Sequence, residues 1–484
     1  MKTLLQSLFV LFLFQSPAIA FADERPNIVL IFTDDQGYGD LSCFGGDHVS
    51  TPRIDQMAAE GARLTSFYVA APVCTPSRAA LMTGCYPQRV DMGTGSNFPV
   101  LLAGDRKGLN PSEITIPEVL KTAGYHTGMF GKWHLGDQPE FLPTRQGFDV
   151  FFGIPYSHDI HPFHPRQAKF RFPPLPLLDG ETVVEMDPNA DLLTKRLTEQ
   201  AVKFIEANKD EPFFVYLPHP IPHVPLHASA KFLTGVDSAT RAAIQKEGGK
   251  KIDYAAREAL FGQAIAELDW SVGEILDTLK ANGLDDNTLV IFTSDNGPGR
   301  HKGTNFQHAG PLSGRKGSTL EGGMREPTVV RWPGHIEAGQ DNAELMTAMD
   351  LLPTFAALAG AELPSDRVID GKDVSAVLFN KQKSPHEAFF YHKVNELQAV
   401  RSGKWKLHLK DPNVKGKGRQ EKNAKPTLYD LEADIAEKVN VIDEHPKVAE
   451  RLQRLVDTFK QELSDNIRPA AFVEKPKPLT MKKQ

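Results

Sequence analysis

The chain has 484 residues and a net charge of −6, and 40% of its residues are hydrophobic and 24% charged. This composition is ordinary for a globular protein, and the length allows two to three domains. The mild acidic balance gives no reason to expect nucleic acid or a membrane surface as a partner, so neither is among the predicted partners.

The first 22 residues differ from the rest of the chain. A positive charge at Lys2 precedes an unbroken apolar run over residues 8–14, and small residues follow at Ala20 and Ala22. This pattern predicts a secretory signal peptide over residues 1–22, cleaved after Ala20 or Ala22. The apolar run is too short for a membrane anchor, which needs about 20 apolar residues.

The small number of cysteines and the absence of glycosylation sequons indicate the cellular compartment in which the protein works. The chain has three cysteines, Cys43, Cys74 and Cys85, and no Asn-x-Ser/Thr sequon in which x is not proline. An exported protein of this size with so few cysteines relies on its core rather than on a disulfide framework. A secreted or lysosomal eukaryotic protein would usually carry such sequons. We therefore expect a secreted or periplasmic bacterial protein.

Strand and helix patterns alternate along the N-terminal part of the chain. Apolar, β-branched runs predict buried strands over residues 27–33, 125–130, 213–217 and 288–293. Periodic patterns with capping residues predict helices over residues 52–60, 116–123, 191–208 and 258–280. The alternation indicates an α/β domain with a largely parallel sheet, in which ligands bind beyond the carboxyl ends of the strands.

The later part of the chain shows other patterns. Residues 154–188 are rich in proline and histidine without periodicity, which predicts a long, functional surface loop. A helix over residues 347–359 and a linker over residues 364–373 precede a smaller α+β unit. Its predicted strands cover residues 389–392, 397–401, 405–409 and 427–431, and its predicted helix covers residues 446–463. The predicted domains are residues 23–363 and 364–466, followed by a disordered tail over residues 467–484.

One cysteine stands at the predicted start of a helix. Cys74 opens the sequence Cys-Thr-Pro-Ser-Arg, and Arg78 follows one turn later. A helix N-terminus and a nearby arginine both favour an anion at this position. From the residues alone, a buried structural cysteine and a thiol nucleophile paired with a histidine both stay open.

Two pairs of hard oxygen ligands follow buried strands. Asp34 and Asp35 come directly after the first predicted strand, and Asp295 and Asn296 follow the last of the four. Carboxylate and amide oxygens suit Ca²⁺ or Mg²⁺ rather than a soft metal. Each pair taken alone would also fit a helix cap or a turn.

Basic side chains recur beside glycines and prolines. Lys132 and His134 lie two residues apart in Gly-Lys-Trp-His-Leu-Gly, His223 lies in Pro-His-Val-Pro, and Lys316 lies in Gly-Arg-Lys-Gly. Lys132 and His134 can both face one cleft, because alternate residues of an extended chain point to the same side. Each block taken alone is equally compatible with ordinary surface side chains.

Together these blocks resemble the type I, formylglycine-dependent sulfatase family. The Cys-x-Pro-Ser-Arg pentapeptide and the Leu-Met-Thr-Gly after it match the family signature, whose cysteine a dedicated enzyme oxidises to formylglycine. Gly-Lys-Trp-His and Lys-Gly-x-Thr-x-Glu-Gly-Gly-x-Arg-Glu-Pro also match, and the blocks follow the family's order from Asn27 to about Pro353. The branch of arylsulfatase A and N-acetylgalactosamine-6-sulfatase is the most similar. Cys85 departs from the arginine that relatives commonly carry there.

The resemblance implies an alkaline-phosphatase-like α/β sandwich, in which helices flank a large, mostly parallel sheet and a smaller C-terminal α+β domain has an antiparallel sheet. It implies one Ca²⁺, or Mg²⁺ in its place, and a formylglycine derived from Cys74. The implied metal ligands are Asp34, Asp35, Cys74 as formylglycine, Asp295 and Asn296. The implied catalytic residues are Cys74, Arg78, Lys132, His134, His223 and Lys316, of which Lys132, His223 and Lys316 also bind the substrate, as does Ser157 in support.

The predicted activity is hydrolysis of sulfate monoesters, with a formylglycine-generating enzyme as the partner for maturation. For an exported bacterial enzyme we expect a sulfated carbohydrate as substrate. The loops expected to contact it lie around His158, His161 and His164, at residues 93–107 and at residues 301–308. Two alternatives stay open. One is a phosphomonoester or phosphonate hydrolase of the same superfamily, and the other is a non-catalytic protein that binds sulfated glycans.

Overall fold

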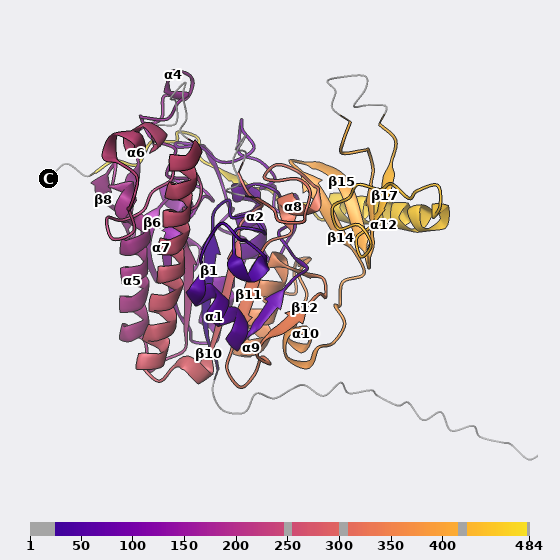
Figure 1. The fold of residues 1–484 in the computed structure, drawn as a ribbon, viewed down its shortest axis with the longest axis horizontal. Coiled ribbons are helices and arrows are strands. Elements are labelled where there is room, and N and C mark those ends of the chain that lie inside the picture. The colour runs from indigo at the N-terminus through magenta and orange to yellow at the C-terminus, as the bar shows by residue number, and fades with distance from the viewer. Residues whose placement is uncertain (1–24, 246–253, 300–307, 415–423, 482–484) are drawn as a thin grey trace, which may run out of the picture.

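The computed structural model describes residues 25–245, 254–299, 308–414 and 424–481, so the predicted signal peptide lies outside the described residues (Figure 1). A ten-stranded sheet forms the centre of the molecule. In spatial order its strands are β12 (Gln340–Asn342), β2 (Ala62–Leu64), β11 (Thr328–Arg331), β10 (Thr288–Ser294), β1 (Asn27–Thr33), β9 (Phe213–Pro218), β5 (His126–Lys132), β6 (Val150–Ile154), β7 (Pro176–Asp179) and β8 (Thr182–Met186). The strands from β10 to β6 are parallel, and β11 and β7 pair antiparallel at either side. The predicted α/β class with a mostly parallel sheet is confirmed.

The composition of β1 explains its place in the middle of the sheet. Every residue of this strand is buried, and its apolar side chains alternate between the two faces. Ile28, Leu30 and Phe32 belong to one core cluster, whereas Val29 and Ile31 belong to another. A parallel strand that is covered on both faces needs apolar side chains on both.

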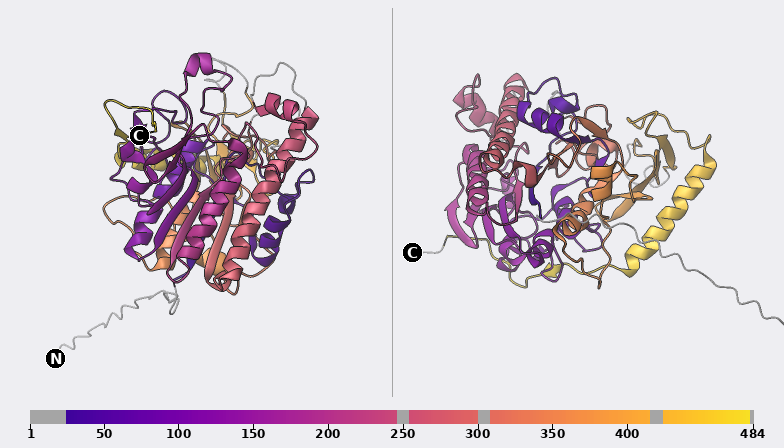
Figure 2. Two further views of the ribbon diagram at one scale, coloured as in Figure 1. Left: turned by 90° about the vertical axis from the view of Figure 1, so that its left-hand side faces the viewer. Right: turned by 90° about the horizontal axis from the view of Figure 1, so that it is seen from below.

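Helices cover the two faces of the sheet (Figures 1 and 2). On one face lie α1 (Pro52–Glu60), α5 (Leu193–Ala207) and α7 (Tyr254–Ala281). On the other lie α2 (Cys74–Thr83), α3 (Ile116–Thr122) and α9 (Leu351–Ala359). Within the ranges that the structure describes, none of the helices has the length and apolar character that crossing a membrane requires.

The parallel strands bring the chemically interesting blocks to one edge of the sheet. In the pairing of β1 with β10, Thr33 lies opposite Ser294, so both strands end at the same level. Asp34 and Asp295 therefore leave the sheet together, and the Asp295 N–H donates to the Thr33 carbonyl oxygen at 3.0 Å. This is the position beyond the carboxyl ends at which ligands bind in such sheets.

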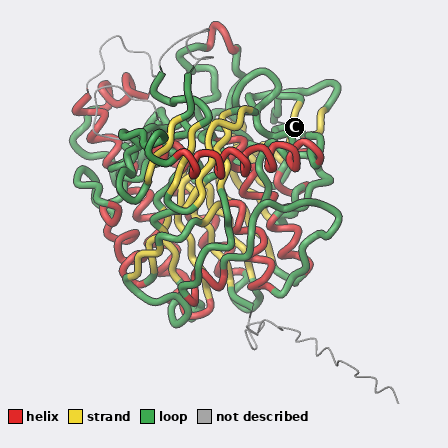
Figure 3. The backbone as a smooth tube through the Cα atoms, turned by 90° about the vertical axis from the view of Figure 1, so that its right-hand side faces the viewer, coloured by secondary structure: helices red, strands yellow, loops and turns green. Residues whose placement is uncertain are grey.

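The C-terminal part of the chain forms a separate antiparallel sheet. Its strands, in spatial order, are β14 (Phe389–Lys393), β15 (Glu396–Ser402), β16 (Trp405–His408) and β17 (Thr427–Asp430). Helix α12 (Pro446–Asp465) packs across this sheet and buries Leu452, Val456 and Phe459, which lie one turn apart (Figure 3). The predicted strands and final helix are confirmed.

Short elements complete the fold. The helices are α4 (Gln167–Phe170), α6 (Ser238–Gln245), α8 (Glu321–Met324) and α10 (Ser375–Asn380), and the strands are β3 (Phe67–Tyr68), β4 (Lys107–Gly108), β13 (Met346–Thr347) and β18 (Ala471–Phe472). The 3₁₀ helices are η1 (Ser42–Phe44), η2 (Pro139–Phe141), η3 (Pro143–Arg145), η4 (Ala190–Leu192), η5 (Asp285–Asn287) and η6 (Ala348–Asp350). The linker predicted over residues 364–373 has no helix or strand, and it is held in place because Arg89 pairs with Asp370 at 2.6 Å.

The prediction of one long loop over residues 154–188 is wrong. This segment contains the hairpin of β7 and β8, which extends the central sheet beyond β6. Leu177, Leu178 and Val183 are buried by that pairing. Gly180, with φ of 57°, makes the tight turn between the two strands. The prolines of the segment hide the alternation of these short strands.

The prediction of a disordered tail over residues 467–484 is also not what the structure shows for the residues it describes there. Residues Ala471–Phe472 form β18, which pairs antiparallel with β4. Further along, the Lys477 N–H donates to Gln138 Oε1 at 2.9 Å. The tail is placed by backbone hydrogen bonds to a strand edge. Such bonds do not depend on side-chain composition, so the composition of the tail does not predict them.

Candidate active site

Cys74 is the first residue of α2, as the sequence predicts. Pro76 fits the first turn, where a backbone N–H has no partner within the helix, and the residues of this helix are buried. The Cys74 Sγ atom lies 3.4 Å from Asp34 Oδ1 and 3.4 Å from Lys316 Nζ. The thiol therefore lies between a carboxylate and an ammonium group rather than among apolar side chains.

Three carboxylates gather around this thiol. One ligand atom from each of Asp34, Asp35, Cys74 and Asp295 lies within 4.8 Å of the others. Asp35 has a left-handed backbone with φ of 66°, and its N–H lies 3.2 Å from Asp295 Oδ1. Such a conformation is held by the surrounding structure and is common at functional sites. Asn296, the remaining predicted metal ligand, donates from Nδ2 to Asp35 Oδ1 at 2.7 Å.

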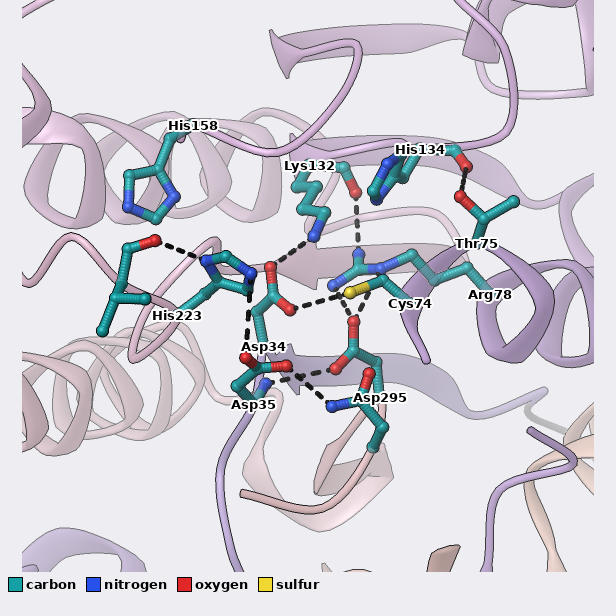
Figure 4. Close-up of polar contacts among 12 residues, drawn as sticks. Asp34, Asp35, Cys74, Thr75, Arg78, Lys132, His134, His158, His223 and Asp295 are labelled. Atoms are coloured by element: carbon teal, nitrogen blue, oxygen red, sulfur yellow. Dashed lines mark hydrogen bonds and ion pairs between the residues drawn. The ribbon is translucent and has the colours of Figure 1, made fainter. Parts of the chain in front are cut away.

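A cation faces each of the three carboxylates, and Figure 4 shows two of these cations, Lys132 and Arg78. The ion pairs are Lys132 with Asp34, Lys316 with Asp35 and Arg78 with Asp295. The nitrogen and oxygen atoms are 2.6 Å apart in the Lys316 pair and 2.8 Å apart in the Arg78 pair. Arg78 also donates to the carbonyl oxygen of Lys132 at 2.9 Å, which ties α2 to the end of β5.

These neighbours set the protonation of the site. Burial by itself would raise the pKa of Asp34, but Lys132 and the other cations outweigh it and hold that pKa well below its usual value. Burial and the carboxylate of Asp34 raise the pKa of Asp295 to about 6. Burial, Asp295 and Asp34 together raise the pKa of the Cys74 thiol. The encoded thiol is therefore neutral, and a neutral thiol is a poor nucleophile.

The donor set fits a hard divalent cation. Asn296 Oδ1 is buried and, within the described part of the chain, has no hydrogen-bond partner. Leaving such an oxygen unpaired costs about 1–3 kcal/mol, and coordination of a cation would remove that cost. Carboxylate and amide oxygens are the ligands that Ca²⁺ and Mg²⁺ take. Asp34, Asp35, Asp295 and Asn296 are thus the residues that would hold the ion.

His134 offers one nitrogen as a proton acceptor. Its Nε2 lies 2.9 Å from the Leu101 carbonyl oxygen, which only accepts, so Nε2 carries the proton. Nδ1 then holds a lone pair, and it is buried without a hydrogen-bond partner among the described residues. Burial and Lys132 keep the pKa of His134 well below its usual value. His134, whose backbone is also left-handed with φ of 66°, is therefore a neutral base.

His223 reaches the carboxylates from another side. Its Nδ1 donates to the Val224 carbonyl oxygen at 2.6 Å, and its Nε2 lies 3.7 Å from Asp35 Oδ2. The side chains of His223 and Lys316 are 12% and 19% exposed, so they border the opening of an otherwise buried cluster. Ser157 is buried and has no hydrogen bond to this cluster among the described residues. Its part in substrate binding stays a prediction.

Two further residues belong to the site and escaped the sequence reasoning. Thr75 Oγ1 donates to the His134 carbonyl oxygen at 3.1 Å and accepts from the Leu101 N–H at 3.1 Å. Glu326 is fully buried with neither carboxyl oxygen paired among the described residues, and burial with two nearby aspartates raises its pKa. Two features of the sequence pointed to these residues. Thr75 is next to Cys74, and Glu326 lies in the Arg-Glu-Pro that matches the family block.

The C-terminal sheet holds the segment that carries Lys316. Glu321, at the start of α8, is buried and accepts from Lys406 Nζ at 2.8 Å and from the Tyr391 hydroxyl at 2.8 Å. Lys406 Nζ also donates to the Thr319 carbonyl oxygen at 2.9 Å. The smaller sheet thus contributes to the site by positioning a cation of the larger unit.

Comparison with known proteins gives consistent matches over the chain. A family model described as Sulfatase matches residues 26–361, and one described as N-sulphoglucosamine sulphohydrolase, C-terminal, matches residues 316–467. Arylsulfatase A of Homo sapiens is 39% identical over 468 residues, 89% of this chain and 87% of that protein. N-acetylgalactosamine-6-sulfatase of Mus musculus is 39% identical over 411 residues, 81% of this chain and 73% of that protein. The crystal structure of Ps i-CgsB in complex with k-i-k-neocarrahexaose is 32% identical, with a TM-score of 0.73 over 92% of this chain and 94% of that one.

Proposed function

Because the chain belongs to the sulfatase family and is a sulfuric ester hydrolase, we propose that its nucleophile is a formylglycine made from Cys74, with one Ca²⁺ bound beside it. The observation that carries this proposal is the surroundings of the Cys74 thiol, which lies among carboxylates with a raised pKa. A thiolate would be repelled there, whereas an uncharged formyl group would not. Conversion by a formylglycine-generating enzyme accounts for a cysteine at such a place.

The charges of the site support an anionic substrate once a divalent cation is bound. Three carboxylates face three basic side chains in one-to-one pairs, so the protein groups alone are close to neutral. A divalent ion held by the carboxylates would leave the site positive. A positive, water-poor site favours the sulfate ester and the negative charge that develops during attack.

The side chains of the site are assigned separate roles in binding sulfate and in transferring protons. Hydrated formylglycine supplies two hydroxyls on one carbon, one to attack sulfur and one whose deprotonation lets sulfate leave and the aldehyde re-form. Lys132 and Lys316 bind sulfate oxygens, and Arg78 orients Asp295. His134 Nδ1 accepts the proton of the second hydroxyl, since it holds a lone pair without a partner among the described residues. His223, at the opening, donates a proton to the departing alcohol oxygen as the sulfur–oxygen bond breaks.

A sulfated carbohydrate is the substrate class that we propose. N-acetylgalactosamine-6-sulfatase carries a sulfated sugar in its name, and Ps i-CgsB was crystallised with an oligosaccharide. We further propose export to a bacterial periplasm or exterior, on the signal pattern of residues 1–22. Sequencing the N-terminus of the mature protein checks the second point, because cleavage after Ala20 or Ala22 is expected.

Release of sulfate and of phosphate from matched esters tests the function. Protein made together with a formylglycine-generating enzyme is expected to release sulfate from a panel of sulfated oligosaccharides and from 4-nitrophenyl sulfate. Faster release of phosphate from 4-nitrophenyl phosphate would favour the phosphomonoester hydrolase instead. Binding of the oligosaccharides without release, by protein with confirmed formylglycine, would favour a non-catalytic glycan-binding protein.

A further inference from the structure

A cavity adjoins the proposed reaction centre on the side of His223. It has a volume of about 280 Å³. Its polar lining consists of His158, His161, Asp187, His227 and Gln245. We call it the histidine pocket. Its inner wall is His158, whose ring lies edge-on to that of His223 with the ring centres 5.8 Å apart. The pocket therefore begins one side chain away from the proposed proton donor.

The geometry of sulfuryl transfer points the alcohol part of the substrate toward this pocket. In an in-line displacement the attacking and departing oxygen atoms lie on opposite sides of sulfur. Figure 4 shows Cys74 and His223 approaching the carboxylates of Asp34 and Asp35 from opposite sides. A nucleophile at residue 74 thus drives the departing oxygen toward His223. The alcohol group attached to that oxygen then extends toward the histidine pocket.

The polar groups of the pocket call for a ligand with hydroxyl groups. His158 Nε2 donates to the Pro225 carbonyl oxygen at 2.9 Å, which leaves Nδ1 as an acceptor. His158 is only 2% exposed, and its Nδ1 has no partner among the described residues. His161 Nδ1 accepts the Phe163 N–H at 3.1 Å, so its Nε2 is a donor. A hydroxyl can donate to the first and accept from the second, whereas a hydrocarbon ring would leave both unpaired.

The rim adds an acceptor and an aromatic surface. Asp187 uses one oxygen to accept the Leu175 N–H at 2.8 Å, and its other oxygen has no donor among the described residues. Phe163, at the mouth of the pocket, is 67% exposed, although large apolar side chains are usually buried. An aromatic face beside convergent polar groups suits a sugar ring, which has an apolar C–H face and a polar edge.

We propose that the histidine pocket binds one pyranose ring, the ring whose sulfate occupies the reaction centre. Ligand pockets commonly measure about 300–1,000 Å³, so a pocket of about 280 Å³, just below this range, takes a single ring rather than a chain of them. His158 and Asp187 accept hydrogen bonds from its hydroxyls, His161 donates one, and Phe163 stacks on its C–H face. This inference rests on the proposed function and specifies the substrate of the same site.

Steady-state kinetics on two kinds of ester test the assignment. The substrates are a panel of monosulfated hexopyranosides and 4-nitrophenyl sulfate, and the variants are Phe163→Ala, Phe163→Trp and Asp187→Asn. Phe163→Ala is expected to raise KM for the preferred pyranoside about tenfold with a smaller change in kcat, and Phe163→Trp is expected to restore KM. Asp187→Asn keeps the oxygen that accepts from Leu175, so it is expected to lower kcat/KM more for the pyranoside than for the aryl ester.

A distant exposed phenylalanine provides the control. Phe472 lies in β18 and is 50% exposed, and Phe472→Ala is expected to leave both substrates unaffected. Equal effects of Phe163→Ala and Phe472→Ala on the pyranoside would overturn the assignment, as would a preference for the aryl ester over every pyranoside. Either result would leave the proposed sulfatase function standing. Absence of sulfate release from every ester, by wild-type protein with confirmed formylglycine, would instead contradict the proposed function itself.

Discussion

Arg78 holds Asp295 through a single oxygen. Its Nε and Nη2 both donate to Oδ2, at 3.0 and 2.8 Å, whereas Oδ1 lies 3.2 Å from the Asp35 backbone nitrogen. Both side chains of the ion pair are buried, where an uncompensated charge is costly. The arginine thus neutralises and orients a carboxylate whose second oxygen stays directed into the cluster of predicted metal ligands.

Removal and return of the cation is the first prediction. Ca²⁺ added to chelated protein is expected to raise Tm, because an ion that binds the folded state at 100 times its Kd stabilises it by about 2.7 kcal/mol. Asn296→Ala is expected to weaken this rise, since it removes a buried ligand oxygen. Asn287, a partly buried asparagine outside this cluster, provides the matched control, Asn287→Ala. A Tm and an activity that chelation leaves unchanged would rule out the cation.

His134 is predicted to act after the alcohol has left. His134→Ala is expected to lower kcat by about 10²–10⁴-fold, because no base removes the proton that lets sulfate leave. The substrate's alcohol should then appear in a rapid burst of one equivalent per active site, followed by slow turnover. Rapid-quench kinetics measure this, with His126→Ala, at the exposed start of β5, as the control. Linear release of alcohol without a burst would contradict the assigned role.

The buried charges at the C-terminal sheet are predicted to be important for stability. Lys406→Met is expected to lower the free energy of unfolding by about 3–5 kcal/mol, since it removes the buried cation that Glu321 and Glu437 share. Arg325 stays beside Glu321, and His408 stays beside Glu437. Lys404→Met, which removes an exposed lysine two residues away, is expected to have a smaller effect. Urea denaturation of the two variants gives the comparison. Equal losses would show that the buried network is not a stabilising element.

The dependence of stability on pH should reflect buried neutral histidines. Burial lowers the pKa of His219 to about 3, so between about pH 6.5 and 3 the unfolded chain binds a proton that the folded protein excludes. Stability therefore falls as the pH falls, by about 1.4 kcal/mol per pH unit for this residue. Burial raises the pKa of Asp137 and of Asp269 to about 6, which acts in the opposite direction, so the comparison needs a variant.

His219→Asn isolates that contribution. Its free energy of unfolding, from urea denaturation at several pH values, should show a slope smaller by one proton than that of the wild type below about pH 6. His158 and His392, whose pKa values burial also lowers to about 3, should give similar differences. An unchanged slope in His219→Asn would mean that this side chain is protonated in the folded protein.

The position of Asp34 and Asp295 at one edge of the sheet could be predicted from the sequence because it follows from local patterns. Asp34 and Asp295 each follow a fully buried strand, and parallel strands end at a common edge. Cys74 could be placed at a helix start from the residues around it. The ligand set and the basic residues came from a resemblance, since no local rule joins Lys316 to a strand so distant in sequence.

Other features depend on tertiary contacts that no local pattern carries. The choice of Nδ1 as the base of His134 follows from the Leu101 carbonyl, which a separate loop brings to Nε2. The hairpin of β7 and β8 and the strand β18 are stabilised by pairing with existing edges, so composition alone predicted loop and disorder there. The histidine pocket likewise depends on tertiary contacts, because its lining residues come from residues 158–190, before α5 in the sequence, and from residues 225–245, after it.

The mass of the peptide that carries Cys74, measured together with activity, tests the central claim most directly. In protein matured by a formylglycine-generating enzyme, loss of SH₂ and gain of O make this peptide about 18 Da lighter than the encoded one. Sulfate release is predicted to rise in proportion to the lighter fraction, and Cys74→Ala is predicted to fold and to release none. Full activity in protein whose peptide carries only unmodified cysteine would contradict the account.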